Sequence, residues 1–317
     1  CVMQPAQAET LSKSAAEKWL LRVAAASEKR NYTGVYTYQY AGQLENYRIA
    51  HVYDSKGVAE KREALDGPPK LLVRLDDNIT LYLPDKIMPN LTRKSVTKLF
   101  PSILPEKPLD LLDNYRLQNM GTERIAGIEA QQIQFIPLDK FRHSYRLWVD
   151  PRSDLLVKAG MYDAKGLIIE QFTFTQFSVL DKLDRQSLAL PNAVQQFAKT
   201  KTQTAKAQLL LNASDDWELK GVPEGFDLVS QNKRLLKGKK DQTVTHFVFS
   251  DGLSSVSVFL APLTEEQAIL PRLNQKSQTR MAEKRAADFE ITVIGDVPEA
   301  TVTQILNSIT PRKKPQK

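Results

Sequence analysis

The stretch that decides the fold is Tyr32-Thr33-Gly34-Val35-Tyr36-Thr37-Tyr38-Gln39-Tyr40. From its first residue on, every second position holds Tyr or Gly, whereas the positions between them hold Thr, Val, Thr and Gln. Side chains of a β-strand point in turn to opposite faces, so this period of two predicts a strand with one aromatic face.

The same alternation continues after a short turn at Ala41-Gly42-Gln43, where alternate positions hold Tyr47, Ile49, His51 and Tyr53. A connection this short has no room for a helical crossover, so it predicts antiparallel pairing in a meander. We expect further strands at 58–65, 70–76, 78–83, 115–122, 128–137, 142–150, 154–162 and 166–178.

An amphipathic helix is expected before the first strand. Ser14 and Glu17 have the spacing of a capping box. One apolar helix face then follows at Ala16, Trp19, Leu20 and Val23. This pattern predicts a helix from about residue 14 to residue 29.

The segment from Pro84 to Pro108 interrupts the strands with five prolines and five basic residues. Loops of this length are uncommon in compact domains unless they serve as a lid or a contact surface. We expect a long loop here, either a mobile flap or a static cover over a sheet edge.

The second half of the chain begins with a polar stretch, 181–216, whose Lys, Gln, Thr and Ala are typical of a linker. Beyond it the patterns predict a smaller α+β domain at 217–311 and a basic tail at 312–317. Within that domain we expect strands at 226–233, 243–250, 254–261 and 288–294, a helix or loop at 264–286, and a closing helix that begins near Pro298 and has Val302, Ile305, Leu306 and Ile309 on one face.

Size and composition fit this division. A chain of 317 residues exceeds the size at which one hydrophobic core usually stops growing. The sequence contains no run of 18 apolar residues, so no membrane-spanning helix is predicted. The net charge of +7 is dispersed, with denser basic stretches at 233–240 and 312–317 that suit a solvated surface, an anionic lipid or an acidic protein patch. No nucleic-acid recognition motif accompanies them.

The first residues suggest an exported protein. Ala6-Gln7-Ala8 fits the small-x-small rule of signal-peptide cleavage, so we interpret residues 1–8 as a signal-peptide remnant and expect the first domain at 9–180. The alternative is that Cys1 bears a lipid and tethers the protein to a membrane. Cys1 is the only cysteine, which excludes an intramolecular disulfide and a cysteine-based metal site.

Motifs of common enzyme classes are missing: there is no Gly-x-Ser-x-Gly elbow, phosphate-binding Gly-rich loop, dinucleotide fingerprint or His-Glu-x-x-His. His51, His143 and His246 are isolated, and we interpret them as ordinary sheet or interface residues. The paired carboxylates Asp76-Asp77 and Asp215-Asp216 lie at expected turns, where Asp caps the backbone. We therefore expect a binding protein without catalytic residues, cofactor or metal.

What remains is an apolar strand surface. It comprises Tyr36, Tyr38, Tyr40, Tyr145, Leu147, Phe172 and Phe174, together with Trp19 of the first helix. In a sheet that curls partway into a barrel, such side chains can enclose an apolar ligand. They can equally fill a core, and the pattern alone favours the core.

Several motifs resemble those of the RseB/MucB family of periplasmic regulators. They keep their order from Trp19 to Ile309, and they are Leu65-Asp66-Gly67-Pro68, Tyr145-Arg146-Leu147-Trp148-Val149-Asp150, the stretch 163–172, Pro223-Glu224-Gly225-Phe226, Phe249-Ser250-Asp251-Gly252-Leu253 and Glu290-Ile291-Thr292-Val293-Ile294-Gly295.

The resemblance implies an N-terminal half-open antiparallel β-barrel like those of the lipoprotein carriers LolA and LolB, closed by helices over an apolar cavity. It implies a periplasmic protein that binds the periplasmic region of a membrane anti-sigma factor of the RseA or MucA type. Binding would shield that partner from site-1 proteolysis and restrain sigma-E (AlgU) signalling. Lipopolysaccharide or another lipid would release the partner.

With these implications, the apolar surface is as good a candidate for the lining of a cavity as for a filled core. For the partner or an anionic ligand, charge clustering suggests contacts at Lys86, Arg93, Lys94, Lys98, Lys233 and Arg234. A periplasmic lipid or lipoprotein carrier is the alternative function, although a carrier needs no second domain. An envelope hydrolase is disfavoured by the missing motifs, and a homodimer is an open alternative.

Overall fold

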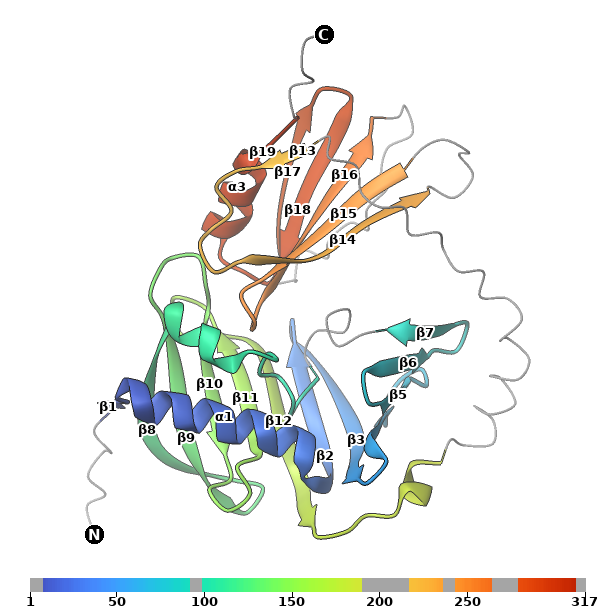
Figure 1. Cartoon of the computed structure of the whole chain (residues 1–317), viewed down its shortest axis with the longest axis vertical. Helices are drawn as coiled ribbons and strands as arrows, with labels where there is room; N and C mark the ends of the chain where they lie inside the picture. The colour runs from blue at the N-terminus through green and yellow to red at the C-terminus, as the bar shows by residue number, and fades with distance from the viewer. Residues whose placement is uncertain (1–7, 92–98, 190–216, 236–242, 264–278, 312–317) are drawn as a thin grey trace. The chain divides into compact units, whose positions relative to one another are not determined.

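A computed structural model describes residues 8–91, 99–189, 217–235, 243–263 and 279–311. The chain divides into two units (Figure 1). Unit 1 comprises residues 1–136 and 144–206, and unit 2 comprises residues 137–143 and 207–317. Of the predicted linker, 181–189 is described and belongs to unit 1, whereas 190–216 lies outside the described residues, as do residues 1–7 and the basic tail.

Near its start unit 1 contains the predicted helix, α1 (Lys13–Lys29), whose buried face includes Ala16, Trp19, Leu20 and Val23. The predicted capping box is wrong, because Ser12 is the N-cap and its hydroxyl accepts from the Ala15 amide at 3.3 Å. Near the other end of the helix, the Glu28 carboxylate accepts hydrogen bonds from both terminal nitrogens of Arg74, at 3.2 and 2.7 Å. This paired contact ties α1 to the sheet.

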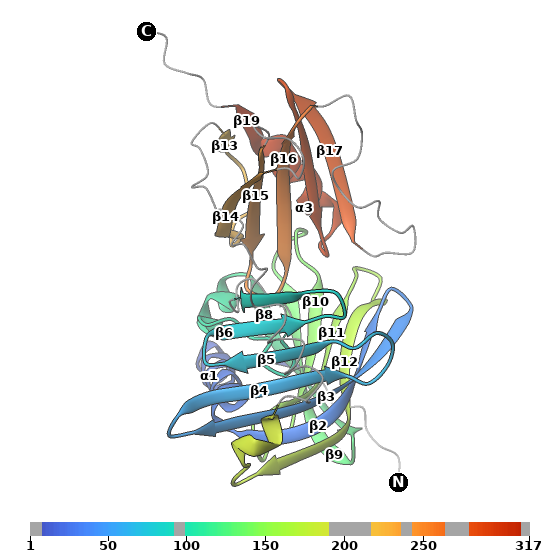
Figure 2. The ribbon, with the colours of Figure 1, turned by 90° about the vertical axis from the view of Figure 1, so that its right-hand side faces the viewer.

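A twelve-stranded antiparallel sheet forms the body of unit 1, in the order β1-β8-β9-β10-β11-β12-β2-β3-β4-β5-β6-β7 (Figures 1 and 2). The sheet is not closed, since β1 and β7 are its two edges among the described strands. Its strands are β1 (Glu9–Thr10), β2 (Asn31–Tyr40), β3 (Gln43–Asp54), β4 (Gly57–Ala64), β5 (Leu71–Leu75), β6 (Asn78–Tyr82), β7 (Ile87–Leu91), β8 (Tyr115–Ile125), β9 (Ile128–Pro137), β10 (Ser144–Val149), β11 (Leu156–Tyr162) and β12 (Ile168–Leu180).

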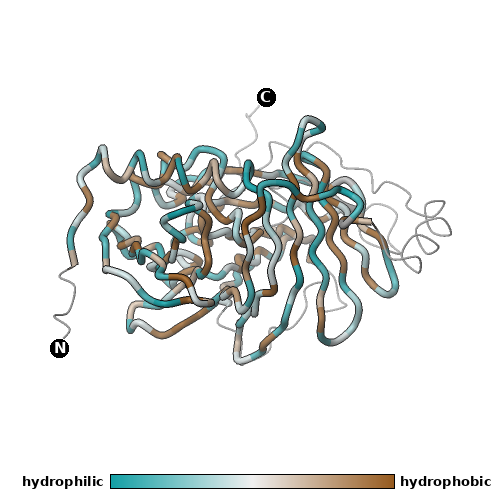
Figure 3. The backbone as a smooth tube through the Cα atoms, turned by 90° about the horizontal axis from the view of Figure 1, so that it is seen from below, coloured by the Kyte–Doolittle hydropathy of each residue, from teal (hydrophilic) through white to brown (hydrophobic). Residues whose placement is uncertain are grey.

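The predicted meander is present twice, in β2 to β7 and in β8 to β12. The two runs are joined because β12 pairs with β2, in a register that sets Phe172 opposite Tyr38 and Phe174 opposite Tyr36. Directly opposite residues share one face, so this register gathers aromatic rings from distant parts of the sequence. Hydrophilic and hydrophobic stretches are interspersed along the backbone (Figure 3).

The segment 84–108 differs from the predicted loop. It contains the edge strand β7, and residues 92–98 lie outside the described part. Leu99, Phe100 and Leu104 are buried, and the 3₁₀ helix η1 (Pro108–Asp113) follows. A second 3₁₀ helix, η2 (Arg185–Leu188), is anchored by Arg185, which binds Asp54 through two hydrogen bonds of 2.7 and 2.8 Å.

Unit 2 is the predicted smaller α+β body. Its five-stranded sheet has the order β14-β15-β16-β18-β17, and a two-stranded sheet pairs β13 with β19. Its elements are β13 (Trp217–Leu219), β14 (Asp227–Leu235), β15 (Thr243–Ser250), β16 (Ser255–Pro262), β17 (Arg280–Ala286), β18 (Phe289–Gly295), α3 (Glu299–Ser308) and β19 (Ile309–Pro311). The helix or loop predicted at 264–286 is wrong at 280–286, which is β17, and 264–278 lies outside the described residues.

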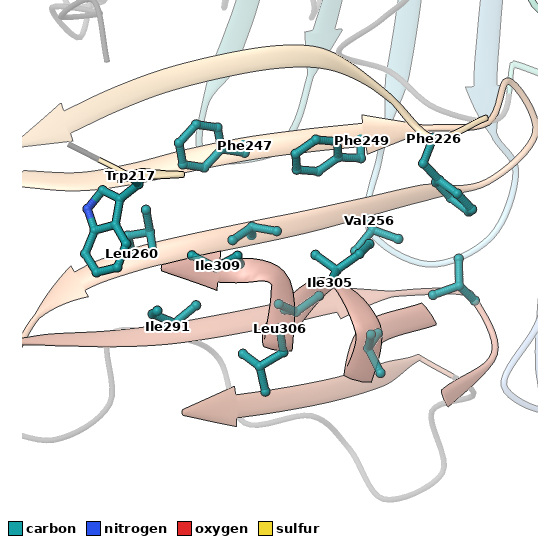
Figure 4. Packing of buried hydrophobic residues seen from close by; sticks show 14 residues of the cluster. Trp217, Phe226, Phe247, Phe249, Val256, Leu260, Ile291, Ile305, Leu306 and Ile309 are labelled. Atoms are coloured by element: carbon teal, nitrogen blue, oxygen red, sulfur yellow. The ribbon is translucent and has the colours of Figure 1, made fainter. Parts of the chain in front are cut away.

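The core of unit 2 lies between its sheet and α3 (Figure 4). Val302, Ile305 and Leu306 of the helix are buried, as the closing-helix pattern predicts, and Ile309 begins the next strand instead of ending the helix. They pack with Phe247, Phe249, Val256, Leu260 and Ile291 of the sheet.

Arg142 is a cation of unit 2 whose side chain is fully buried. Its guanidinium contacts the Asp139 carboxylate and the Glu224 carbonyl, and lies 4.9 Å from the Phe226 ring centre. Its Nε is 3.2 Å from Oδ2 of the equally buried Asp251, an ion pair without hydrogen-bond geometry. Segment 137–143 is thus bound into unit 2 by charge.

Replacing Arg142 with Leu should destabilise unit 2 by about 3–5 kcal/mol, because it leaves the Asp251 carboxylate buried without its cation. Urea unfolding followed by fluorescence measures this change in a background in which Trp19 and Trp148 are replaced by Phe, so that Trp217 is the only tryptophan. Lys220→Leu is the matched control, since Lys220 of unit 2 pairs with Glu218 but its side chain is 78% exposed. Equal effects of the two substitutions would contradict the assignment.

Candidate functional site

A cluster of buried aromatic rings occupies one face of the joined sheet. Tyr36 of β2 lies 5.8 Å from Phe174 of β12, and 6.2 Å from Phe172, between ring centres. Phe100, from outside the sheet, lies 5.4 Å from Tyr36, 5.4 Å from Phe172 and 5.0 Å from Phe174. Phe100 is 0% exposed, so its ring fills the space in front of the three sheet residues.

From this cluster a row of stacked rings runs toward the end of β2. The ring of Tyr38 lies 4.7 Å from that of Phe172, and 6.3 Å from that of Tyr40, with nearly parallel planes in the second pair. Both tyrosines are half-buried. The Tyr38 hydroxyl donates to the buried Glu170 carboxylate at 2.8 Å. The row therefore connects the half-exposed end of the strand with the fully buried Phe100.

Trp19, Tyr145 and Leu147 lie in other contacts of unit 1. Trp19 packs edge-on against Phe135 at 5.9 Å, Phe135 against Tyr115 at 6.1 Å, and Tyr115 against Tyr145 at 6.3 Å. Leu147 is fully buried. The structure thus brings together Tyr36, Tyr38, Tyr40, Phe172 and Phe174, and gives the other predicted lining residues separate partners.

The sequence interpretation missed Phe100, Phe135 and Tyr115. Phe135 sits at a buried position of a predicted strand, so its alternation could have found it. Phe100 has no such signal, because it lies in a segment without regular secondary structure; only the apolar pair Leu99-Phe100 before Pro101 marks it.

The predicted basic contacts are distributed over both units. Lys86 is exposed just before the edge strand β7. Lys233 is half-buried on β14, the strand that also carries Arg234. Arg93, Lys94 and Lys98 lie outside the described residues. Unit 2 also has a groove of about 580 Å³, lined by Lys140, Phe141, Glu299, Ala300, Thr303, Gln304 and Asn307.

A row of buried polar side chains crosses unit 1 beside the aromatic cluster. Strand pairing sets Tyr32 opposite His51, His51 opposite Glu60, and Glu60 opposite Arg74. The ring of Tyr32 stacks on that of His51 at 4.7 Å. Arg62 lies beside this row and donates from Nε to Glu60 at 2.5 Å.

Burial governs ionisation in this polar row. It raises the pKa of Tyr32 and lowers the pKa of His51. Burial is the largest influence and would raise the pKa of Glu60, but the charge and hydrogen bond of Arg62, together with the charges of His51 and Arg74, hold that pKa below its usual value. The carboxylate and the guanidinium therefore stay charged while the histidine is kept neutral.

Three atoms of the polar row and one of the adjacent Arg62 have no hydrogen-bond partner: Tyr32 Oη, His51 Nε2, Glu60 Oε2 and Arg62 Nη2. His51 Nδ1 lies 2.9 Å from the Arg30 carbonyl, which assigns its ring proton to Nδ1 in the neutral form. Buried polar atoms without hydrogen-bond partners are costly, so burying this row costs unit 1 free energy.

Other predicted chemistry is accounted for structurally. The ring of His246 stacks on Phe259 at 4.2 Å and contacts the Ser257 hydroxyl at 3.0 Å. Asp76 is a turn residue with φ +50° whose carboxylate accepts from the Val58 amide. Asp215-Asp216 lies outside the described residues. Within the described ranges no three His, Cys, Asp or Glu residues are placed to hold a metal ion, and no helix there is long and apolar enough to cross a membrane.

Comparison with known families gives two adjacent matches. The model of the MucB/RseB N-terminal domain matches residues 15–192, and that of the MucB/RseB C-terminal domain matches residues 212–310. Both belong to one family, and it is the family that the sequence motifs indicated.

Curated relatives match over most of both chains. The sigma factor AlgU regulatory protein MucB of Pseudomonas aeruginosa is 27% identical over 310 residues, 95% of this chain and 93% of the relative. The sigma-E factor regulatory protein RseB of Haemophilus influenzae is 21% identical over 309 residues, 96% of this chain and 93% of the relative.

Two solved structures are similar throughout. The complex of Pseudomonas aeruginosa MucA and MucB contains a chain with a TM-score of 0.75 and 25% identity, covering 94% of this chain and 99% of that one. MucB in complex with MucA(peri) gives a TM-score of 0.72 and 25% identity, covering 94% of this chain and 100% of that one.

The neutral, buried His51 should make unit 1 less stable as the pH falls. Its pKa is lowered on folding, so the unfolded chain takes up a proton first near pH 6.5. Stability should therefore be full above that pH and decline below it, by at most about 1.4 kcal/mol per pH unit. The pKa of Glu60 is lowered from 4.5, so its contribution is lost only at lower pH.

Urea unfolding of unit 1 between about pH 7.5 and 5.5 measures this slope. His51→Gln should flatten it, whereas the control His246→Gln, in unit 2, should leave it unchanged. An undiminished slope in His51→Gln would disprove the assignment.

Proposed function

The chain belongs to the MucB/RseB family, and on this basis we propose that it binds the periplasmic region of a membrane anti-sigma factor and so restrains a sigma-E type response. The observation that carries the proposal is the match over both units to MucB solved in complex with MucA, at a TM-score of 0.75. The curated relatives bear the names of sigma-E and AlgU regulatory proteins. A periplasmic location follows from such a partner.

The proposed mechanism is steric. A site-1 protease must hold its substrate as an extended chain, and it cannot do so while another protein holds the same segment. In the described part of the chain, β7 and β14 each have one hydrogen-bonded neighbour and a free edge. An extended segment can add to such an edge through main-chain hydrogen bonds.

The predicted basic contacts support this choice of edges. Lys86 directly precedes β7, and Lys233 and Arg234 lie on β14. We include all three in the proposed contact set, with Arg93, Lys94 and Lys98 of the neighbouring segment. Basic side chains beside a free edge favour an acidic segment of the partner and raise its association rate.

We further propose that lipid or lipopolysaccharide binds unit 1 and releases the partner. Unit 1 is proposed to be a half-open barrel of the LolA/LolB type, and its lining is proposed to include Trp19, Tyr36, Tyr38, Tyr40, Tyr145, Leu147, Phe172 and Phe174. Release requires only that the lipid bind more tightly to a form that binds the partner weakly. The proposed domains are residues 9–180 and 217–311, joined by the linker at 181–216.

A lipid or lipoprotein carrier is the less supported alternative. Both MucB/RseB domain models match, and a carrier has no use for the second domain. The named relatives are regulatory proteins, and none of the proposed steps uses a catalytic group.

Partner capture tests the function. An immobilised periplasmic segment of an anti-sigma factor of the MucA type should retain the protein. The bound protein should also slow cleavage of that segment by a DegS-type protease. Added lipopolysaccharide should restore cleavage. Failure to bind the segment with or without lipopolysaccharide would refute the regulator and favour the carrier.

Charge reversal at the proposed edges should weaken partner binding. Lys86→Glu and Lys233→Glu should each raise the Kd by about tenfold at low salt and less at high salt, because surface charges act mainly through screened attraction. Titration calorimetry at two salt concentrations measures both effects. Lys165→Glu is the control, an exposed lysine in the turn between β11 and β12. An unchanged Kd in both edge variants would remove these residues from the contact set.

A further inference from the structure

We propose that the Phe100 side chain is an internal occupant of an acyl-chain site, and that an apolar chain binds unit 1 by taking the place of this ring. The inference rests on the proposed function for its ligand class, and it names the residue that the ligand must displace.

Phe100 differs in origin from the rings around it. Tyr36, Phe172 and Phe174 belong to paired strands, whereas residues 99–104 belong to neither helix nor strand. Moving the Phe100 ring therefore breaks no pair of the sheet ladder. The three sheet rings hold their positions through the β12–β2 pairing and would line the vacated space on three sides.

The stacked row supplies an entrance to that space. Phe172 is 8% exposed, while Tyr38 and Tyr40 are half-buried and continue the row toward the strand end. At that end the turn into β12 presents Leu167 and Ile168, which are 61% and 43% exposed. An apolar chain entering there passes the Glu170 carboxylate, which accepts from the Tyr38 hydroxyl, and then meets the stacked rings up to Phe100.

The exchange of the Phe100 ring for a long acyl chain lowers the free energy. Burying one phenylalanine side chain is equivalent to burying about three methylene groups. An acyl chain of a dozen carbons buries several times that number, so it can displace the ring and still gain. Tyr38 and Tyr40 offer ring faces along which the remaining methylenes lie.

The opposing interpretation is that Phe100 is a permanent core residue like Phe135. Both are 0% exposed phenylalanines of unit 1, but Phe135 lies on β9 among Trp19 and Tyr115. This similarity makes Phe135 a matched control. Removing an internal competitor tightens ligand binding, whereas removing an ordinary core ring does not.

The test uses the full chain and 11-(dansylamino)undecanoic acid, a fatty acid with a fluorescent end group. Phe100→Ala and Phe100→Leu should lower its Kd by about tenfold relative to the native protein. Phe135→Leu should leave the Kd within about twofold. Far-UV circular dichroism and a cooperative melt identify the folded variants, and Phe100→Leu decides if Phe100→Ala does not fold.

Two outcomes overturn the inference. One is that the Phe100 variants fold but bind the probe no more tightly than the native protein. The other is that no variant binds the probe at all. Partner capture by the same variants without lipid is measured in parallel. If the native protein does not capture the partner, the proposed function is refuted, whereas the result with the fatty-acid probe still stands.

Discussion

The pairing of β12 with β2 is the contact on which unit 1 depends. Each of the two meanders pairs its strands in sequence order, and this one ladder joins them. Its register sets Phe172 beside Tyr38 and Phe174 beside Tyr36, which creates the aromatic face that Phe100 covers. A slip by one residue would turn every ring of β12 to the other face and remove the cluster.

Local patterns predicted most of the strands and α1, because each element has one buried and one exposed face. Alternation identifies faces but not partners, so the β12–β2 neighbourhood could not be read from either strand alone. The burial of Phe100 could not be predicted for the same reason, since the rings that cover it lie far away in the sequence and its own segment has no periodic pattern. The stretch 280–286 has the basic, Ala-containing composition of a helix, but pairing with β18 makes it a strand.

The buried polar row adds a second control on register. Tyr32, His51, Glu60 and Arg74 lie opposite one another across four strands, and Arg74 continues to Glu28 of α1. Burying these groups costs free energy that an apolar row would not. In return, any shift of β4 separates Glu60 from His51 and Arg74. Charge thus specifies the alignment of β3, β4 and β5 where the aromatic rings do not reach.

The distance along the chain between β2 and β12 has a consequence for how the protein is made. Tyr38 and Glu170, joined by a hydrogen bond across this ladder, are separated by 132 positions. Contacts of such long range form late, because the loop between them must first be closed. A growing chain therefore exposes the aromatic side and the open edge of β2 until β12 has been synthesised. Unit 1 consequently needs protection from aggregation during that interval, and its folding is governed by the arrival of its last strand.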